Sequence, residues 1–349
     1  MLEVNRTLSM MLTYQCTAEC ENCGTLSHPR RKEYISREDA LRKIEEAAEL
    51  GMRLVVFTGG EVTLRWQDLI FLIRESKELG LLTRVVTNGY WATTTRKASE
   101  KVKALFDAGL SEMNLSTGDE HAKFVPLDCV VRAAVASAAY MSTVIMMEVR
   151  AGNSLVGDSL RSHPVLANAR DDLRSKIGIV ESPWMPLSPD EQYEYPLGKA
   201  ANRKNTPLRG GCESALSTYT VQGSGIVGAC CGLGLQTIPE LNIGNLSTPL
   251  EEIINQAEQD LIKRAIRVLG TFRILAWVEA LNPSVVWENI YAHHCQACKR
   301  IYSDPNIQDI ILENIDSFKK FVEDAEFSNH QIVANWMTNF NELVASDAT

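Results

Sequence analysis

Six short apolar runs rich in β-branched residues recur through the first two hundred residues, and they constrain the fold more than any other feature. The runs cover residues 7–14, 53–59, 82–89, 112–118, 143–149 and 176–182, and helical patterns separate most of them. Strand, helix and strand repeated in this order predict parallel βαβ units. We therefore expect an α/β fold, a partial (β/α)6 TIM-like barrel with fewer strands than the complete eight-stranded form.

The first predicted helix has clear start and stop signals. Ser36 is a suitable N-cap with Asp39 three residues later, and Gly51 follows as a stop before the second strand. The apolar residues between them recur along one helical face: Leu41, Ile44, Ala47 and Ala48.

Length and residue pattern suggest three parts. The 349 residues, 45% of them hydrophobic, suffice for one large domain with appendages or for two domains. After about residue 205 the elements shorten and glycine and proline become frequent, so we expect boundaries that give parts 1–205, 206–303 and 304–349. The chain has no signal peptide and no run of roughly 18 apolar residues, so we expect a soluble, cytoplasmic protein without membrane contact.

Negative charge is concentrated at the C-terminal end. Residues 304–349 contain nine acidic and two basic side chains, which leaves the rest of the chain close to neutral. This distribution lacks the basic footprint of a nucleic-acid-binding protein, so no nucleic-acid partner is expected. Isoleucines at positions 307, 310, 311 and 315 have helical spacing, which predicts an acidic helical tail that caps the barrel or docks on the core.

Three cysteines follow the first predicted strand directly. Cys16, Cys20 and Cys23 are too few for a closed zinc site and odd in number for disulfides. Nine cysteines in a chain of this length are also too sparse for a disulfide scaffold, and their spacings favour metal or redox chemistry. A chance cluster and a structural zinc site are the alternatives.

Polar groups follow the other strands at the same predicted barrel mouth. Gly59 and Gly60 are expected to let a ligand approach with the backbone N–H groups free, and Glu61 adds a carboxylate suited to an ammonium group. Further polar residues end the next three strands, at 88–89, 116–119 and 148–150. This ring is suited to a small zwitterionic ligand. Three thiolates on a cubane of four irons leave one iron open, and an amine with a carboxylate would fill that position.

The CxxxCxxC pattern at residues 16–23, paired with GGE at residues 59–61, resembles the radical S-adenosylmethionine (SAM) superfamily. The resemblance covers roughly residues 7–205. It implies a [4Fe-4S] cluster on Cys16, Cys20 and Cys23 whose open iron chelates the amine and carboxylate of S-adenosylmethionine. It also implies that Glu61 contacts the methionyl amine and that Gly59 and Gly60 line the same pocket. Ribose and carboxylate contacts are implied at Ser116, Asp119 and Arg150.

One position departs from the family pattern. Asn22 stands where an aromatic residue is common, which removes an expected ring contact to adenine from this loop. The chemistry implied is reductive cleavage of S-adenosylmethionine to a 5′-deoxyadenosyl radical that abstracts a hydrogen atom from a substrate. An electron donor such as flavodoxin or ferredoxin is implied with it.

A second cysteine group lies beyond the barrel. Cys212 precedes a predicted hairpin that turns at 223–225 and ends at Cys230 and Cys231, and a CxxC pair follows at Cys295 and Cys298. A zinc ribbon is the structural alternative. The segment resembles the SPASM and twitch domains, which implies a small C-terminal iron–sulfur domain. Its cysteines are too few for two extra clusters, so the resemblance implies one auxiliary [4Fe-4S] cluster, used for electron transfer. Its ligands would be Cys212, Cys230, Cys295 and Cys298, with Cys231 as an alternative to Cys230.

Several residues allow two interpretations. Cys129 is expected to be a buried packing residue, with hydrogen-atom donation as the alternative, which the spare hairpin cysteine shares. His293 and His294 are expected in a solvated loop, or as donors to cluster sulfurs. Residues 195–203 are expected either to meet adenine or to form a turn with a basic tail.

The implied domain pair is typical of enzymes that modify peptides. A ribosomally made precursor peptide is the expected substrate, with a cross-link, thioether, epimer or backbone excision as the product. An enzyme of a small metabolite such as a sugar or nucleoside is the first alternative, and a non-catalytic iron–sulfur or zinc scaffold is the second. The sequence begins almost at the first strand, so we expect a separate peptide-recognition protein, or the auxiliary region itself, to bind the peptide.

Overall fold

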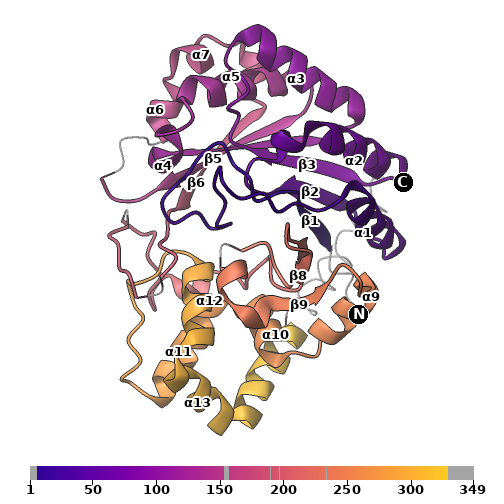
Figure 1. The fold of residues 1–349 in the computed structure, drawn as a ribbon. Coiled ribbons are helices and arrows are strands. Elements are labelled where there is room, and N and C mark those ends of the chain that lie inside the picture. Colours follow the sequence, from indigo (N-terminus) through magenta and orange to yellow (C-terminus); the bar gives the residue numbers. More distant parts are fainter. Residues whose placement is uncertain (1–5, 153–156, 189, 196, 233, 329–349) are drawn as a thin grey trace, which may run out of the picture.

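The computed structural model describes residues 6–152, 157–188, 190–195, 197–232 and 234–328. One nine-stranded sheet runs through the molecule in the order β6-β5-β4-β3-β2-β1-β7-β8-β9 (Figure 1). The six predicted strands form its parallel part: β1 (Thr7–Met11), β2 (Leu54–Thr58), β3 (Leu82–Thr87), β4 (Glu112–Gly118), β5 (Ser142–Val149) and β6 (Ile177–Pro183). The predicted α/β fold with a partial barrel is therefore confirmed.

Helices connect these strands across the outer face of the sheet (Figure 1). The crossovers are α1 (Arg37–Glu49), η1 (Val62–Arg65) with α2 (Trp66–Glu78), α3 (Thr95–Ala108), and α4 (Asp119–Ala122) with α5 (Leu127–Ala138). Three short helices lie between β5 and β6: α6 (Gly157–Arg161), α7 (Pro164–Ala167) and α8 (Asp171–Arg174). Helix α1 begins as predicted, because the Ser36 side chain accepts a hydrogen bond of 3.0 Å from the Asp39 N–H.

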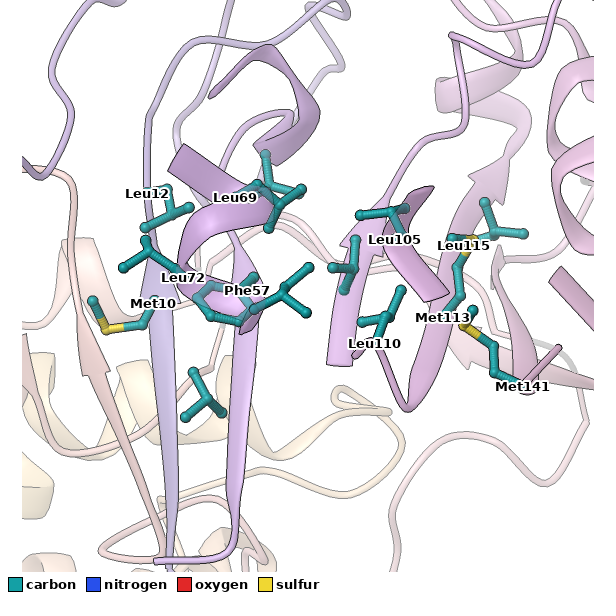
Figure 2. Packing of buried hydrophobic residues seen from close by; sticks show 14 of the residues in the cluster. Met10, Leu12, Phe57, Leu69, Leu72, Leu105, Leu110, Met113, Leu115 and Met141 are labelled. Atoms are coloured by element: carbon teal, nitrogen blue, oxygen red, sulfur yellow. The ribbon is translucent and has the colours of Figure 1, made fainter. Parts of the chain in front are cut away.

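Strand alternation separates the core from the site. In β1, Leu8 and Met10 are fully buried and belong to the main hydrophobic core (Figure 2). Ser9 and Met11 point to the opposite side and line a cavity. The main core therefore fixes the strands from the helix side and leaves the other side for the site.

The sheet continues past residue 205. Strand β7 (Thr218–Val221) pairs in parallel with β1, and β8 (Ile226–Gly228) and β9 (Asn242–Asn245) follow as antiparallel strands. Tyr219 and Val221 of β7 are fully buried in the main core. The predicted hairpin is present, but its first strand extends the barrel sheet, so the boundary expected at residue 205 does not interrupt that sheet.

A second hydrophobic core is built from the C-terminal helices. Helix α9 (Leu250–Ala257) still packs on the main core, whereas later helices surround Phe272 and Trp287 in the second one. Those helices are α10 (Leu261–Val268), α11 (Thr271–Leu281), α12 (His294–Ser303) and α13 (Pro305–Glu313). Short 3-10 turns complete the region: η2 (Thr206–Leu208), η3 (Leu235–Thr237) and η4 (Pro239–Leu241).

The acidic tail docks on this second core. Ile307, Ile310 and Ile311 are buried there, together with residues of the following helical turns. Ile315 was expected on the same face but is 41% exposed, and the buried face continues instead at Phe318 and Val322. The remainder of the predicted tail, residues 329–349, lies outside the described residues. Among the described helices, none has the length and apolarity required to cross a membrane.

Candidate functional site

A cavity of about 340 Å³ opens at the C-terminal ends of the parallel strands. This first cavity lies where barrel and doubly wound folds place their sites, and its size suits a small ligand. It brings together the three N-terminal cysteines, the glycine pair and residues from four other strand ends. The lining includes Cys16, Cys20, Cys23, Thr58, Gly59, Gly60, Asn88, Ser116, Met147, Glu148, Ser182 and Trp184.

The three thiols have polar neighbours suited to a sulfur-ligated cluster. Cys16 Sγ accepts from the Ala18 N–H at 3.4 Å and from Asn88 Nδ2 at 3.9 Å, and Cys23 Sγ lies 3.4 Å from Thr25 Oγ1. Such hydrogen bonds to sulfur are among the means by which proteins adjust iron–sulfur clusters. Burial raises the pKa of Cys16 to about 11, so a bound metal cation is needed to stabilise its thiolate near pH 7. The donor set therefore fits the predicted cluster.

The glycine pair packs tightly against the backbone that leads into the cysteine loop. Gly59 has φ of +144°, and a Cβ at this residue would lie 2.3 Å from the Thr13 carbonyl oxygen. A Cβ at Gly60 would lie 2.3 Å from the Gln15 carbonyl oxygen. The Gly60 N–H donates to Thr13 at 2.7 Å and the Glu61 N–H donates to Gln15 at 2.8 Å. The expectation of a free N–H group is therefore wrong for Gly60, whose N–H fixes the loop.

The Glu61 carboxylate also differs from expectation. It is fully buried and is not among the described residues that line the first cavity. It caps η1 by accepting from the N–H and the hydroxyl of Thr63, at 3.1 and 2.6 Å. It also accepts from Thr87 Oγ1 at 2.8 Å and the Asn88 N–H at 2.9 Å. Burial raises its pKa despite these bonds. In this structure Glu61 joins the ends of β2 and β3 through these hydrogen bonds.

The other predicted contacts are only partly brought together. Ser116 lines the first cavity, whereas Asp119 and Arg150 are not among the described lining residues. The Arg150 guanidinium lies 4.6 Å from the centre of the Trp184 ring, and its Nη2 lies 3.4 Å from a carboxylate oxygen of Glu120. Arg150 therefore packs on Trp184, which lines the cavity, and is not itself among the described lining residues.

Sequence reasoning missed a close contact between a histidine and a carboxylate at the cavity. His121 Nδ1 lies 2.8 Å from Glu148 Oε1, and both residues line the first cavity. Glu148 was noted only as part of a strand end. The signal that could have found the pair is the position of His121 just after the fourth strand, on the same edge as the cysteines.

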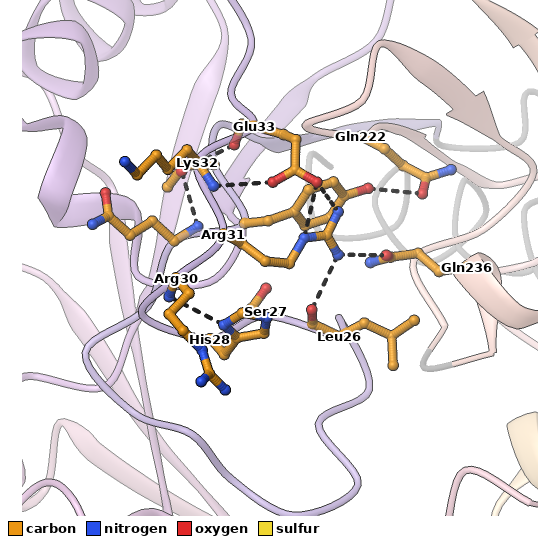
Figure 3. A network of polar contacts seen from close by, with 12 residues as sticks. Leu26, Ser27, His28, Arg30, Arg31, Lys32, Glu33, Gln222 and Gln236 are labelled. Carbon is orange, nitrogen blue, oxygen red and sulfur yellow. Dashed lines mark hydrogen bonds and ion pairs between the residues drawn. The ribbon is translucent and has the colours of Figure 1, made fainter.

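A polar network ties the cysteine loop to the C-terminal part (Figure 3). The Arg31 guanidinium lies over the Tyr14 ring at 3.8 Å, and Tyr14 Oη donates to Gln222 Oε1 at 3.1 Å. Gln236 Nε2 donates to the Thr25 carbonyl oxygen at 2.5 Å, while Arg31 Nη1 donates to Gln236 Oε1 at 3.5 Å. Gln236 also lines the first cavity, so the C-terminal part forms one of its walls.

The second cysteine group lines another cavity, of about 590 Å³. This second cavity contains all five C-terminal cysteines: Cys212, Cys230, Cys231, Cys295 and Cys298. Gly232 leaves the space between two of them, since a Cβ there would lie 2.8 Å from Cys295 Sγ and 3.5 Å from Cys230 Sγ. In the part of the chain that the structure describes, no three His, Cys, Asp or Glu side chains are grouped closely enough for a single metal ion.

Cys231 lies between the two cavities. It lines both, together with Ser182 and Gly232, so the cavities adjoin at this point. Its Sγ lies 3.0 Å from Ser214 Oγ, and its N–H donates to the same hydroxyl at 2.9 Å.

The adjacent histidines lie half-buried at the start of α12. His293 caps the helix by accepting from the Cys295 N–H at 3.2 Å, and His294 Nδ1 lies 2.9 Å from Thr271 Oγ1. Burial lowers the pKa of each histidine to about 4, so both are neutral near pH 7. Both line the second cavity, which differs from the solvated loop that was expected.

Two further expectations concern the core and the segment after β6. Cys129 is 4% exposed and packs in the main core on α5.

Pro196 lies outside the described residues. The described residues of the 195–203 segment are absent from the lining of the first cavity, and the Ala201 N–H donates to the Tyr291 carbonyl oxygen at 2.7 Å. The backbone that follows β6 into the cavity is that of residues 182–185.

The N-terminal part of the chain is similar to a known protein family. Residues 10–119 match the family model described as Radical SAM superfamily. The chain contains a radical SAM superfamily domain. The cysteine loop, the glycine pair and the first four strands all fall within the matched segment.

Several relatives of this radical SAM domain are named PqqA peptide cyclase. The Rhodopseudomonas palustris protein is 34% identical over 106 residues, which is 30% of this chain and 26% of that protein. The Methylorubrum populi protein is 36% identical over 106 residues, with the same shares. The chain thus spans about a quarter of the length of these relatives.

Solved structures share the fold over a longer range. The anSMEcpe structure with bound AdoMet and Cp18Cys peptide superposes with a TM-score of 0.52 at 14% identity, covering 91% of this chain and 99% of that one. Streptococcus suis SuiB bound to precursor peptide SuiA gives a TM-score of 0.53 at 13% identity, covering 71% of this chain and 64% of that one. At these identities the likeness shows the fold alone.

Proposed function

We propose that this chain is a radical SAM enzyme that modifies a ribosomally made precursor peptide. The observation that carries the proposal is the meeting of Cys16, Cys20 and Cys23 with Gly59 and Gly60 in one cavity. Three thiols are one fewer than a four-iron cluster needs, and the same cavity has room for a ligand beside them.

In this proposal the three cysteines hold a [4Fe-4S] cluster and the first cavity holds S-adenosylmethionine. When bound, this pair supplies a 5′-deoxyadenosyl radical that abstracts a hydrogen atom from the substrate. The protein's own groups orient and enclose it. Gly59 and Gly60 form the floor, Ser116 and the His121–Glu148 pair supply polar groups, and Trp184 excludes water.

In this proposal Glu61 has a structural role. It fixes the turn after β2 to the end of β3, and so sets the position of the glycine pair. Asp119 and Arg150 are not among the described lining residues of the first cavity, so the proposal assigns them no contact with the ligand.

We assign an auxiliary [4Fe-4S] cluster to the second cavity, on Cys212, Cys230, Cys295 and Cys298. Support comes from the five cysteines in one cavity and from the space that Gly232 leaves beside Cys230 and Cys295. Four protein thiolates leave no iron open, so electron transfer is the role assigned to it. The electron donor would be a flavodoxin or ferredoxin, in the cytoplasm.

A peptide substrate is supported by the relatives whose name is PqqA peptide cyclase. Their likeness is confined to about 30% of this chain, so the bond formed is left open among cross-links, epimers and backbone excision. Peptide capture by a separate recognition protein is part of the proposal.

Deuterium transfer tests the substrate class. The reconstituted protein is reduced anaerobically with S-adenosylmethionine and a deuterated candidate peptide encoded beside its gene. The proposal predicts deuterium in the 5′-deoxyadenosine, measured by mass spectrometry. If 5′-deoxyadenosine forms but acquires deuterium only from a labelled sugar or nucleoside, the peptide assignment is wrong and the enzyme assignment stands.

A further inference from the structure

A short segment after β6 connects the two cysteine sites. This bridging segment, residues 184–187, begins at the wall of the first cavity, where Trp184 and Met185 are each 6% exposed. It continues toward α12, and residues 185–187 share a small gap with Asn22, Cys295 and Lys299. The segment therefore touches residues of both cysteine groups.

Asn22 holds the bridging segment from the side of the first site. It immediately precedes Cys23 and has φ of +55°, a left-handed conformation that asparagine tolerates better than most residues. Its Oδ1 accepts a hydrogen bond of 3.1 Å from the Leu187 N–H. The residue that replaces the aromatic side chain common at this position is thus bonded to the bridging segment.

Lys299 holds the same residue from the side of the second site. It immediately follows Cys298 on α12, and its Nζ donates to the Leu187 carbonyl oxygen at 2.7 Å. Gln296, which lies between Cys295 and Cys298, adds a contact further along the chain by donating to the Glu191 carbonyl oxygen at 3.2 Å. The two peptide groups that flank Leu187 are therefore anchored to opposite cysteine sites.

The bridging segment contributes Trp184 to the wall of the first cavity. The Trp184 N–H donates to the Val149 carbonyl oxygen at 2.9 Å, and Arg150 packs on its ring. Tyr193 meets the ring edge-on, with centroids 4.7 Å apart. The hydrogen bond to Val149 fixes the start of the bridging segment on β5. The mobility of the rest of the segment therefore depends on the hydrogen bonds of Leu187.

We propose that Asn22 and Lys299 are positioning residues that clamp Leu187 between the two cysteine sites and so hold Trp184 and Met185 in the wall of the first cavity. A change at the start of α12 then reaches the first cavity without touching its ligand. The identity of that ligand rests on the proposed function, whereas the clamp rests on the hydrogen bonds alone.

Hydrogen exchange of the reconstituted full chain tests the clamp. Asn22→Gly keeps the left-handed backbone and removes the acceptor, and Lys299→Met removes the donor with little change in length. Asn22→Gly should speed exchange of the Leu187 amide by about tenfold, the effect of losing its one hydrogen bond. Lys299→Met should also speed this exchange, because it frees the neighbouring peptide group at the Leu187 carbonyl oxygen. Asn22→Asp, which keeps an acceptor oxygen, should restore a rate near that of the wild type.

Matched controls come from the same chain. Asn289 is another left-handed asparagine, with φ of +61°, and Lys320 pairs only with Asp324 on the surface. Asn289→Gly and Lys320→Met should leave the Leu187 amide unchanged. If Lys299→Met also leaves it unchanged, or if the controls speed it equally, the clamp is refuted.

Binding of S-adenosylmethionine tests the effect on the first cavity. At equal iron content, Lys299→Met should weaken its affinity by about threefold or more, although Lys299 lies beside the second cysteine group. Unchanged affinity in a variant with fast Leu187 exchange would overturn the positioning role. If the wild-type protein itself binds no S-adenosylmethionine, the proposed function fails, and the exchange rates still decide whether the clamp exists.

Discussion

Replacing Glu61 with alanine should destabilise the fold, because this carboxylate joins two strand ends. It is fully buried and accepts four hydrogen bonds, from Thr63 N–H and Oγ1, Thr87 Oγ1 and the Asn88 N–H. Alanine leaves the N–H groups of Thr63 and Asn88 without this acceptor. The hydroxyl groups can rotate toward other partners, so the two N–H groups dominate the loss.

The size of the effect follows from those two groups. A buried N–H without a partner costs about 1–3 kcal/mol, which gives about 2–6 kcal/mol for the pair. Burial raises the pKa of Glu61, which means that burying its charge is unfavourable. Removing the carboxylate also removes this unfavourable contribution, so the net loss of stability is smaller than the sum for the two N–H groups. We therefore expect the free energy of unfolding to fall by about 2–4 kcal/mol. Glu61→Gln keeps the shape of the side chain but places its NH₂ group, a donor, against one of the backbone N–H donors. This variant should lower the free energy of unfolding by about 1–3 kcal/mol.

Urea denaturation of the cluster-free protein, followed by circular dichroism, measures this change. Glu100→Ala is the matched control, because Glu100 is exposed and pairs only with Arg96 one helical turn away. It should change stability by less than about 0.5 kcal/mol. If Glu61→Ala unfolds at the wild-type urea concentration but no longer binds S-adenosylmethionine, the structural role is wrong and Glu61 is a ligand contact.

Further predictions concern glycine and the hairpin cysteines. Gly60→Ala should destabilise the protein and reduce the iron content of the first site, because its Cβ would lie 2.3 Å from the Gln15 carbonyl oxygen. Gly210 has open space around it, so the control variant Gly210→Ala should leave both stability and iron content unchanged. Iron analysis checks both variants. Cys230→Ala should lose about four irons per chain, whereas Cys231→Ala should keep them, since Cys231 bonds to a serine and Cys230 lies beside Cys295 across Gly232. The reverse result would make Cys231 the ligand.

The parallel strands and the first cysteine site could be predicted from the sequence, because both depend on local patterns. Strand runs and helix caps are short-range signals, as the Ser36 cap illustrates. The carboxyl ends of parallel strands meet at one edge, so Cys16 and Gly60 had to lie near each other once the strands were assigned.

The orientation of Glu61 could not be predicted in the same way. A carboxylate after a glycine pair can face a ligand or cap the next turn, and the choice depends on the distant end of β3. Thr87 and Asn88 supply two of its four hydrogen bonds from there. These hydrogen bonds hold the side chain in its inward orientation, although burial disfavours its charge.

The contribution of the C-terminal part to the first cavity could not be predicted from local sequence patterns either. Strand β7 pairs with β1 across more than two hundred residues, and Leu235 and Gln236 reach the first cavity as a result. Hydrophobic periodicity indicates a strand but not its partner. Trp184 was missed for a related reason, since a single aromatic residue after a strand carries no signal of a cavity wall.

Formation of 5′-deoxyadenosine tests the central claim most directly. The reconstituted protein, reduced anaerobically with S-adenosylmethionine, should bind about eight irons and release 5′-deoxyadenosine. The Cys16→Ala, Cys20→Ala, Cys23→Ala triple variant should keep about four irons at the second site and release none. A wild-type protein that binds about eight irons and releases no 5′-deoxyadenosine, or a triple variant that still releases it, would contradict the account.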